Sequence, residues 1–217
     1  MNELHIDIYS DVICPWCYIG KQRLDQVLDS PDGEGVTVRW RAYQLQPRIP
    51  EGGIDRLTYL KSRYGEGADA ARVPSRILAE ASDEGLTLDF GAIERMPNTF
   101  AAHRLMWLAF ERGGEEVQHR LAGRLFEAYF RDGEDVEERS VLVRLGGEAG
   151  LVEAEVAEFL ASDEGAEAVR EELAQAVDVG VSGVPCYVLG GMFPFPGPQT
   201  AEVMGQFVRR AKERLGG

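Results

Sequence analysis

Near its N-terminus the chain reads Asp11-Val12-Ile13-Cys14-Pro15-Trp16-Cys17-Tyr18. Residues 4–9, just before it, alternate apolar and polar side chains, which is the period of a strand. Residues 16–28 repeat apolar or small side chains at helical spacing. Pro15 suits a first helical position, because its missing N–H would have no intrahelical partner there. A Cys-x-x-Cys pair at a strand-to-helix junction is typical of a thiol–disulfide site.

A second strand follows this predicted helix. Turn residues at 30–35 end the helix, and residues 36–43 alternate again. Strand, helix and strand within about 40 residues predict a βαβ unit with parallel strands and a right-handed crossover. Residues 47–53, rich in Pro and Gly, break the pattern and indicate a linker.

The rest of the chain is helical first and then returns to strands. Residues 54–179 repeat apolar side chains at helical spacing, with short breaks that include Gly113-Gly114. Residues 184–189 predict a strand, residues 192–197 the second arm of a hairpin, and residues 203–215 an amphipathic helix. The order βαβ, helices, ββα requires strands from both ends to join in one sheet.

Composition narrows the classes of function. The chain has 217 residues, of which 44% are hydrophobic, enough for a folded core. Its formal net charge of −14 repels phosphate backbones and anionic lipids, so we expect neither a nucleic acid nor a membrane as partner. No stretch reaches the roughly 20 apolar residues of a membrane span. The N-terminus lacks the pattern of a secretory signal, which predicts a cytoplasmic protein whose disulfides are transient.

The order of elements, with Cys-x-x-Cys opening the first helix and Val-Pro before a late strand, resembles the thioredoxin fold. Because a large helical insertion separates the two halves of that fold, the chain resembles the DsbA-like branch in particular. Segments similar to the FrnE-like subgroup are residues 10–20, Asn98-Thr99, Ala102-His103-Arg104 and residues 180–185. The resemblance covers essentially the whole chain. The resemblance implies an α/β thioredoxin-like fold (βαβ…ββα), disulfide oxidoreductase chemistry that needs no cofactor, and a cis Val184–Pro185 bond.

On that fold, residues 1–53 and 180–217 form a thioredoxin-like domain, and residues 54–179 form an inserted helical domain. The resemblance also implies that substrates are held across a groove between the Val184–Pro185 loop and the two cysteines. The alternative for Pro185 is a plain turn proline before a strand. If its bond is cis, the Val184 backbone N–H and C=O are exposed to a substrate strand.

Cys14 and Cys17 are the expected catalytic residues. A thiolate attacks in disulfide exchange, and Cys14 stands where the N–H groups and the dipole of a helix favour negative charge. Cys17 lies one turn further in. We therefore expect Cys14 to form a mixed disulfide with a protein or small-thiol substrate, such as glutathione, and Cys17 to resolve it. The alternative is half a zinc site, but the other cysteine and the histidines show no matching spacing, so no metal is expected.

Other side chains have two interpretations each. Trp16 is either an exposed apolar contact for substrate or a cap of the helix against the insertion. Cys186 is either a third redox thiol or a small buried hydrophobe. Asp11 either relays a proton to or from the cysteines or caps nearby N–H groups. His103 either lines the groove or is structural, and His119 is expected on a solvated face.

The leading prediction of function is a thiol–disulfide oxidoreductase. The first rival is a glutathione-dependent isomerase or transferase of the kappa or hydroxychromene-carboxylate isomerase type. Those proteins resemble this architecture but commonly have serine where Cys14 stands, without a second cysteine, so the presence of both argues against this rival. The second rival is a non-enzymatic polypeptide-binding holdase, whose activity should survive loss of both thiols.

Overall fold

The computed structural model describes residues 3–69, 73–191 and 194–215. Its main sheet has the strand order β2-β1-β5-β6, so strands from both ends of the chain join in one sheet, as predicted. These strands are β1 (Leu4–Ser10), β2 (Val36–Ala42), β5 (Cys186–Leu189) and β6 (Phe195–Pro196). β1 and β2 are parallel, with Leu4 opposite Val36, whereas β5 is antiparallel to β1 and β6 to β5.

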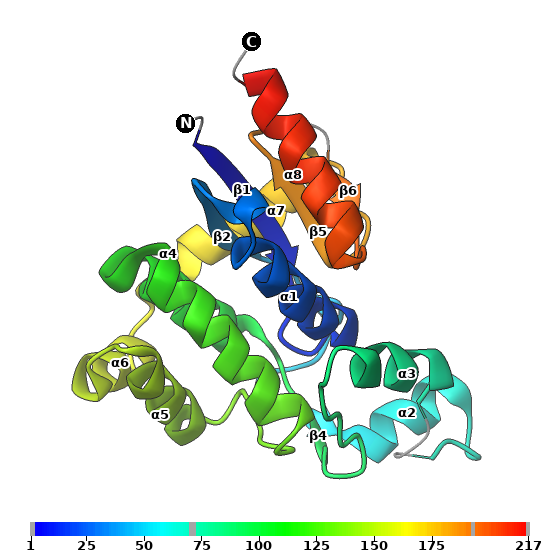
Figure 1. Cartoon of the computed structure of the whole chain (residues 1–217). Coiled ribbons are helices and arrows are strands. Elements are labelled where there is room, and N and C mark those ends of the chain that lie inside the picture. Colours follow the sequence, from blue (N-terminus) through cyan, green and yellow to red (C-terminus); the bar gives the residue numbers. More distant parts are fainter. Residues whose placement is uncertain (1–2, 70–72, 192–193, 216–217) are drawn as a thin grey trace.

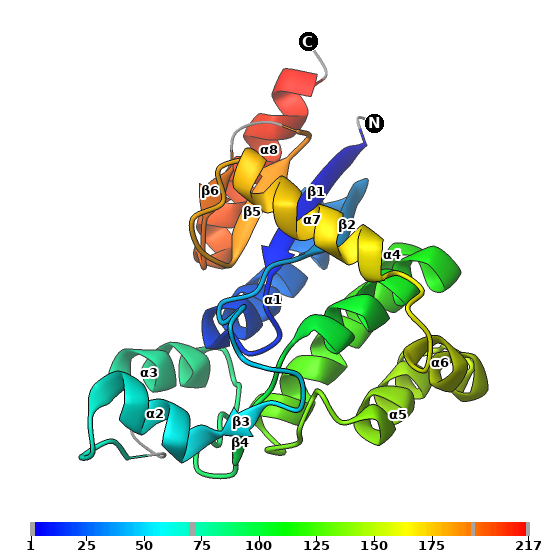
Figure 2. The same cartoon turned by 180° about the vertical axis from the view of Figure 1, so that it is seen from behind.

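Helices cover both faces of this sheet. The main helices are α1 (Pro15–Leu28), α4 (Phe100–Phe130), α5 (Arg139–Ala149), α6 (Glu153–Leu160), α7 (Ala166–Asp178) and α8 (Ala201–Leu215). Figure 1 shows α1 and α8 on one face, and Figure 2 shows α7 across the other. This order confirms the predicted α/β arrangement, βαβ followed by helices and ββα. Within the described residues, no helix has the length and hydropathy needed to cross a membrane.

Between β2 and α7 the chain forms two helical groups. One is α4 with α5 and α6, which pack on each other beside β2. The other is a small lobe near the start of α1 (Figure 1). It contains the short strands β3 (Ile54–Asp55) and β4 (Arg95–Met96), with helices α2 (Arg56–Tyr64) and α3 (Ser75–Asp83). The predicted break at Gly113-Gly114 is a kink in α4, where Gly114 adopts a φ of 70° that favours glycine.

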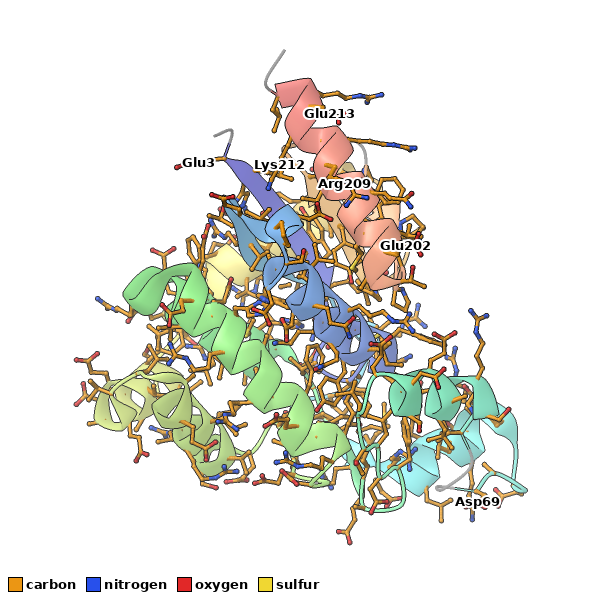
Figure 3. The ribbon with its side chains drawn as sticks, viewed as in Figure 1. Glu3, Asp69, Glu202, Arg209, Lys212 and Glu213 are labelled. Carbon is orange, nitrogen blue, oxygen red and sulfur yellow. The ribbon has the colours of Figure 1, made fainter. Side chains whose placement is uncertain are left out.

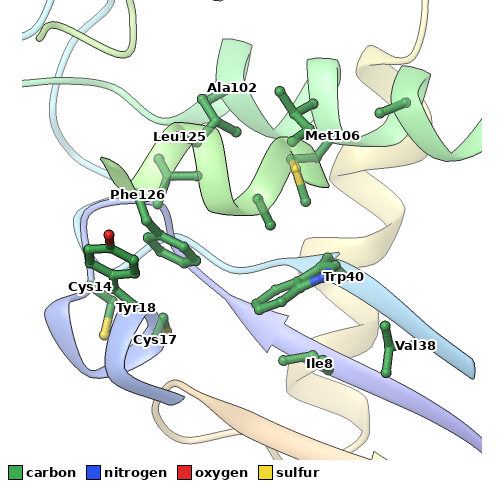
Figure 4. Close-up of a cluster of buried hydrophobic side chains, with 14 of the residues drawn as sticks. Ile8, Cys14, Cys17, Tyr18, Val38, Trp40, Ala102, Met106, Leu125 and Phe126 are labelled. Carbon is green, nitrogen blue, oxygen red and sulfur yellow. The ribbon is translucent and has the colours of Figure 1, made fainter. Parts of the chain in front are cut away.

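α7 differs from the other helices in residues 54–179. It packs on both β2 and α4, so it covers the sheet although its sequence lies in the stretch predicted as an insertion. The hydrophobic cluster around Tyr18, Phe126 and Trp40 is also continuous between α1, α4 and the sheet (Figure 4). The ring centroids of Tyr18 and Phe126 lie 5.4 Å apart. The division into two domains stays a prediction.

β2 is an edge strand of the sheet, and side chains from two helices form hydrogen bonds with its free backbone N–H and C=O groups. Gln118 of α4 accepts a hydrogen bond from the Trp40 N–H at 2.8 Å and donates one to the Trp40 carbonyl at 3.0 Å. The Glu172 carboxylate of α7 accepts from the Ala42 N–H at 3.1 Å. These contacts replace a neighbouring strand, because buried backbone polar groups need partners.

The prediction of a solvated face for His119 is wrong. The Trp40 indole N–H donates to His119 Nδ1 at 3.1 Å, and His119 Nε2 lies 2.7 Å from an Asp25 oxygen. His119 follows Gln118 on α4, so this turn of the helix faces β2 and α1 rather than solvent.

The C-terminal segment is held at two places. On α8, Arg209 pairs with Asp32, and Lys212 Nζ donates to the backbone carbonyl of Asp32 at 2.7 Å; Figure 3 labels both basic side chains. Asp32 belongs to η1 (Pro31–Gly33), the 3₁₀ turn after α1. At the hairpin, β6 pairs with β5 as predicted, but residues 192–193 of the predicted second arm lie outside the described residues.

Candidate active site

Cys14 is the N-cap of α1. Its backbone is extended, with φ −94° and ψ 111°, and its carbonyl accepts hydrogen bonds from the N–H groups of Cys17 and Tyr18 at 3.0 and 3.3 Å. Pro15 follows at the start of the helix, where no N–H donor is needed. The Cys14 thiol points toward the late loop and donates to the Val184 carbonyl at 3.5 Å. Two segments 170 residues apart therefore meet at this thiol.

Cys17 lies deeper than Cys14. Its side chain is 0% exposed, against 3% for Cys14. Burial, a hydrogen bond with Cys14 and the charge of Cys14 raise the pKa of the Cys17 thiol well above its ordinary value. Hydrogen bonds from the Ser10 side chain and the Asp11 backbone act in the opposite direction. Cys17 is therefore a thiol at neutral pH in this state, and Ser10 has a contact with Cys17 that the sequence did not predict.

The loop opposite the cysteines packs tightly on α1. Its Val184–Pro185 peptide bond is cis, and so is Gly197–Pro198. The Gly197 N–H donates to the Pro185 carbonyl at 2.8 Å, which joins the two proline loops. A Cβ on Gly20 of α1 would lie 2.5 Å from the Tyr187 hydroxyl and 3.2 Å from Pro185 Cγ. Only glycine at this position lets α1 approach the loop so closely.

Trp16 lies between the cysteines and the small helical lobe. It is half-buried, contacts the cluster of Ile19 and Ile77, and has the Arg76 guanidinium 5.6 Å from its ring centroid. Part of the ring therefore packs against the insertion, as one of its two interpretations predicts, and part remains accessible; its contact with substrate stays a prediction.

Asp11 and His103 form a buried pair behind the site. Asp11 is fully buried; its Oδ2 accepts the Leu45 N–H at 2.7 Å, and its Oδ1 lies 3.5 Å from His103 Nε2. His103 Nε2 is also 2.9 Å from the Tyr43 carbonyl, which can only accept, so this nitrogen carries a proton. Among the described residues, Asp11 Oδ1 has no hydrogen-bond partner at ordinary distance. Asp11 therefore accepts a hydrogen bond from a backbone N–H, as one of its two interpretations predicts, but that N–H belongs to Leu45, which is distant in the sequence.

Cys186 has apolar surroundings. It lies opposite Tyr9 in the β1–β5 ladder and packs with Ala176, Val181 and Val188. Burial raises the pKa of its thiol. These surroundings favour its interpretation as a small buried hydrophobe. Among the residues that the structure describes, no group of three or more His, Cys, Asp or Glu side chains is placed to hold a metal ion.

Comparison with known proteins identifies the family. A model of the DSBA-like thioredoxin domain matches residues 5–208. The chain belongs to this family. The crystal structure of a probable DsbA oxidoreductase from Streptomyces coelicolor is 32% identical, with a TM-score of 0.82, and the match covers 96% of this chain and 90% of that one. The predicted DsbA-like resemblance is thereby confirmed, and the chain is placed in a family of thiol–disulfide oxidoreductases.

Two more distant structures share the fold. Cytosolic disulfide reductase DsbM from Pseudomonas aeruginosa is 20% identical, with a TM-score of 0.66, and the match covers 98% of this chain and 97% of that one. A 2-hydroxychromene-2-carboxylate isomerase is 19% identical, with a TM-score of 0.67, and the match covers 97% and 95%. A protein described as a disulfide reductase and one described as an isomerase therefore share this fold.

Proposed function

We propose that this DsbA-like protein catalyses thiol–disulfide exchange through Cys14 and Cys17. The observation that carries the proposal is the placement of the Cys14 thiol, at the N-cap of α1 and 3.5 Å from the Val184 carbonyl. A helix N-terminus stabilises a thiolate, which is the attacking species. Cys17 lies one turn deeper, within reach of Cys14, where it can attack only after Cys14 has reacted.

The exchange consists of two balanced steps. The Cys14 thiolate attacks one sulfur of a substrate disulfide, forms a mixed disulfide and releases the other half as a thiolate. Cys17 then loses its proton and attacks Cys14, which forms the Cys14–Cys17 disulfide and releases the second half. The substrate gains two electrons and the dithiol loses two. The reverse sequence oxidises a substrate dithiol, and the reduction potential of the pair sets the net direction.

The loop opposite the thiols is the proposed substrate wall. Val184 offers backbone groups next to Cys14, so an extended substrate can pair with it as an added strand. Pro185 removes a donor from that backbone and fixes the loop against Gly20. Trp16 contacts the substrate on the other side of the thiols.

We propose protein or small-molecule disulfides and dithiols as substrates, with glutathione among them. One structure of the Pseudomonas DsbM has been solved with GSH, and that protein is described as cytosolic. These descriptions support a small thiol as substrate and the cytoplasm as place of action. Membership of the FrnE-like subgroup is proposed from the resemblance of residues 10–20, 98–104 and 180–185 to that subgroup.

Insulin reduction by dithiothreitol tests the proposed function. The parent protein should accelerate precipitation of the insulin B chain, and Cys14→Ser and Cys17→Ser should both lose this acceleration. Cys186→Ser is the matched control and should retain it, because Cys186 lies in an apolar cluster. Full activity in Cys14→Ser would refute the proposal.

The isomerase fold supports a second candidate, a glutathione-dependent isomerase or transferase. That chemistry uses one nucleophile and needs no resolving thiol. If the protein isomerises a hydroxychromene carboxylate with glutathione and Cys17→Ser is as active as the parent, this candidate replaces the first. A holdase would still suppress aggregation of an unfolded client in the variant that lacks both thiols.

A further inference from the structure

A groove lies between the N-terminal end of α1, α3 and the loop that leads into α8, and these three segments supply its lining residues. It has a volume of about 300 Å³. Its lining residues are Trp16, Arg76, Glu80, Gly197 and Pro198. The sequence predicted Trp16 as a contact for substrate but gave no reason to connect it with the other four.

Hydrogen bonds and close contacts place this groove next to the proposed substrate wall. The Gly197 N–H binds the Pro185 carbonyl, and Pro185 follows Val184, whose carbonyl accepts from the Cys14 thiol. Pro198 Cβ lies 3.6 Å from the position of a Cβ on Gly20, so it stands against the first turns of α1. A substrate bound to Cys14 and along Val184 therefore has the groove as the nearest place for its next residue.

The charge exposed in the groove is positive. The Arg76 side chain is 80% exposed and stands over the Trp16 ring. Glu80 is oriented instead toward the buried Arg23, whose guanidinium donates to it at 2.5 Å and to Glu84 at 2.6 Å. Arg76 also forms an i,i+4 ion pair with Glu80, in which its Nε donates at 3.4 Å, so a carboxylate in the groove would share Arg76 with Glu80 and use its remaining N–H groups. Arg76 is therefore the group best placed to meet an incoming anion.

We propose that this groove is a substrate subsite in which Arg76 binds a carboxylate that flanks the reacting sulfur and Trp16 packs on the adjoining chain. Guanidinium groups bind carboxylates with two parallel hydrogen bonds, and Arg76 already has an aromatic ring that orients it. The preferred substrates are disulfides with a carboxylate within one or two residues of the half-cystine. This subsite rests on the proposed exchange at Cys14.

The overall charge makes this preference informative. A chain with a formal net charge of −14 attracts cationic substrates from a distance. A local preference for an acidic flank opposes that general attraction, so the two effects can be separated. Arg76 belongs to α3 in the small helical lobe, so in this proposal the lobe determines which disulfides react best at Cys14.

The test compares two small disulfides of opposite charge. Stopped-flow mixing of the reduced protein gives the rate constant for oxidation by glutathione disulfide, which carries carboxylates beside its cysteines, and by cystamine, which carries only amines. In the parent, Arg76 favours glutathione disulfide. Arg76→Gln should lower the ratio of the two rate constants by about threefold, and Arg76→Glu by about tenfold, as expected for an exposed ion pair and its reversal.

Arg210→Glu on α8 is the matched control, because it makes the same change in net charge at an exposed position. If Arg76→Glu changes the ratio no more than Arg210→Glu does, the subsite is refuted, while oxidation by both compounds upholds the exchange at Cys14. If neither compound oxidises the parent's cysteine pair, the proposed function fails, and the subsite fails with it.

Discussion

The pKa of Cys17 is raised first by burial, and the neighbouring Cys14 adds to the effect. A raised thiol pKa means a small thiolate fraction at neutral pH, so the resolving step depends on how readily Cys17 loses its proton. Ser10 and the Asp11 backbone are the groups that favour the thiolate there. Ser10 and Asp11 therefore influence a step that the Cys-x-x-Cys spacing alone does not describe.

A titration measures this effect directly. In a Cys14→Ser/Cys186→Ser variant, Cys17 is the remaining cysteine and its burial persists. The ultraviolet absorbance of the thiolate should appear with a midpoint above the ordinary value of about 8.5. The same variant in denaturant serves as the control and should titrate near that value. A midpoint in the folded variant at or below 8.5 would show that burial does not govern Cys17.

Asp11 offers a second prediction at this scale. Asp11→Ala leaves the Leu45 N–H without its acceptor, and a buried unpaired donor costs about 1–3 kcal/mol. Asp11→Asn keeps a carbonyl oxygen in the same place, so it should cost clearly less. Urea unfolding of both variants gives the two free energies. Equal losses would mean that the hydrogen bond to Leu45 contributes nothing to stability.

At the scale of elements, β2 depends on side chains from two helices. Gln118 both accepts from and donates to the backbone of Trp40, as a neighbouring strand would. Glu172 of α7 accepts a hydrogen bond from the Ala42 N–H. Helix α4 therefore closes the edge of the sheet in addition to supplying apolar side chains.

Removing the Gln118 side-chain amide should destabilise the protein. Gln118→Leu leaves both polar groups of Trp40 buried and unpaired, which should lower the free energy of unfolding by about 2–4 kcal/mol. Arg120→Leu is the control, because Arg120 is exposed on the same helix, and it should change the free energy of unfolding by less than about 0.5 kcal/mol. Thermal and urea unfolding supply the values. A Leu variant as stable as the parent would show that solvent reaches this strand.

Periodicity explains which elements could be predicted. The strands at residues 4–10 and 36–42 and the helix after Pro15 follow from local alternation and spacing, which the backbone geometry imposes. The burial of His119 and the position of α7 on β2 could not be predicted, because a helical period indicates an apolar face but not the element that will cover it. Cys14 and Cys17 were found by their spacing, whereas Ser10 and Arg76 meet the site only through tertiary contacts.

At the scale of the whole molecule, one hydrophobic cluster includes residues of the sheet, of α1 and of the helical insertion. Tyr18 follows Cys17 directly and stacks on Phe126 of α4 (Figure 4). The thiol helix is therefore fixed from the insertion side as well as from the sheet side. The segments 1–53 with 180–217 and 54–179 are distinct in sequence, but they share this core.

The shared core predicts one cooperative unfolding transition. Circular dichroism reports mainly the helices, while tryptophan fluorescence reports Trp16, Trp40 and Trp107, which lie in α1, β2 and α4. Both signals should change at the same urea concentration, with a single slope. Phe126→Leu, which weakens the contact between α1 and α4, should shift both curves together. Two separate transitions in the parent would contradict a shared core and support independent domains.

The most direct test of the central claim is the mass of the complex trapped in a Cys17→Ser variant by glutathione disulfide. We predict one glutathione adduct, located at Cys14 by peptide mapping, and in the parent under the same conditions a Cys14–Cys17 disulfide without adduct. An adduct located at Cys186, or a Cys14 that stays unmodified, would contradict the assignment of Cys14 as the attacking thiol.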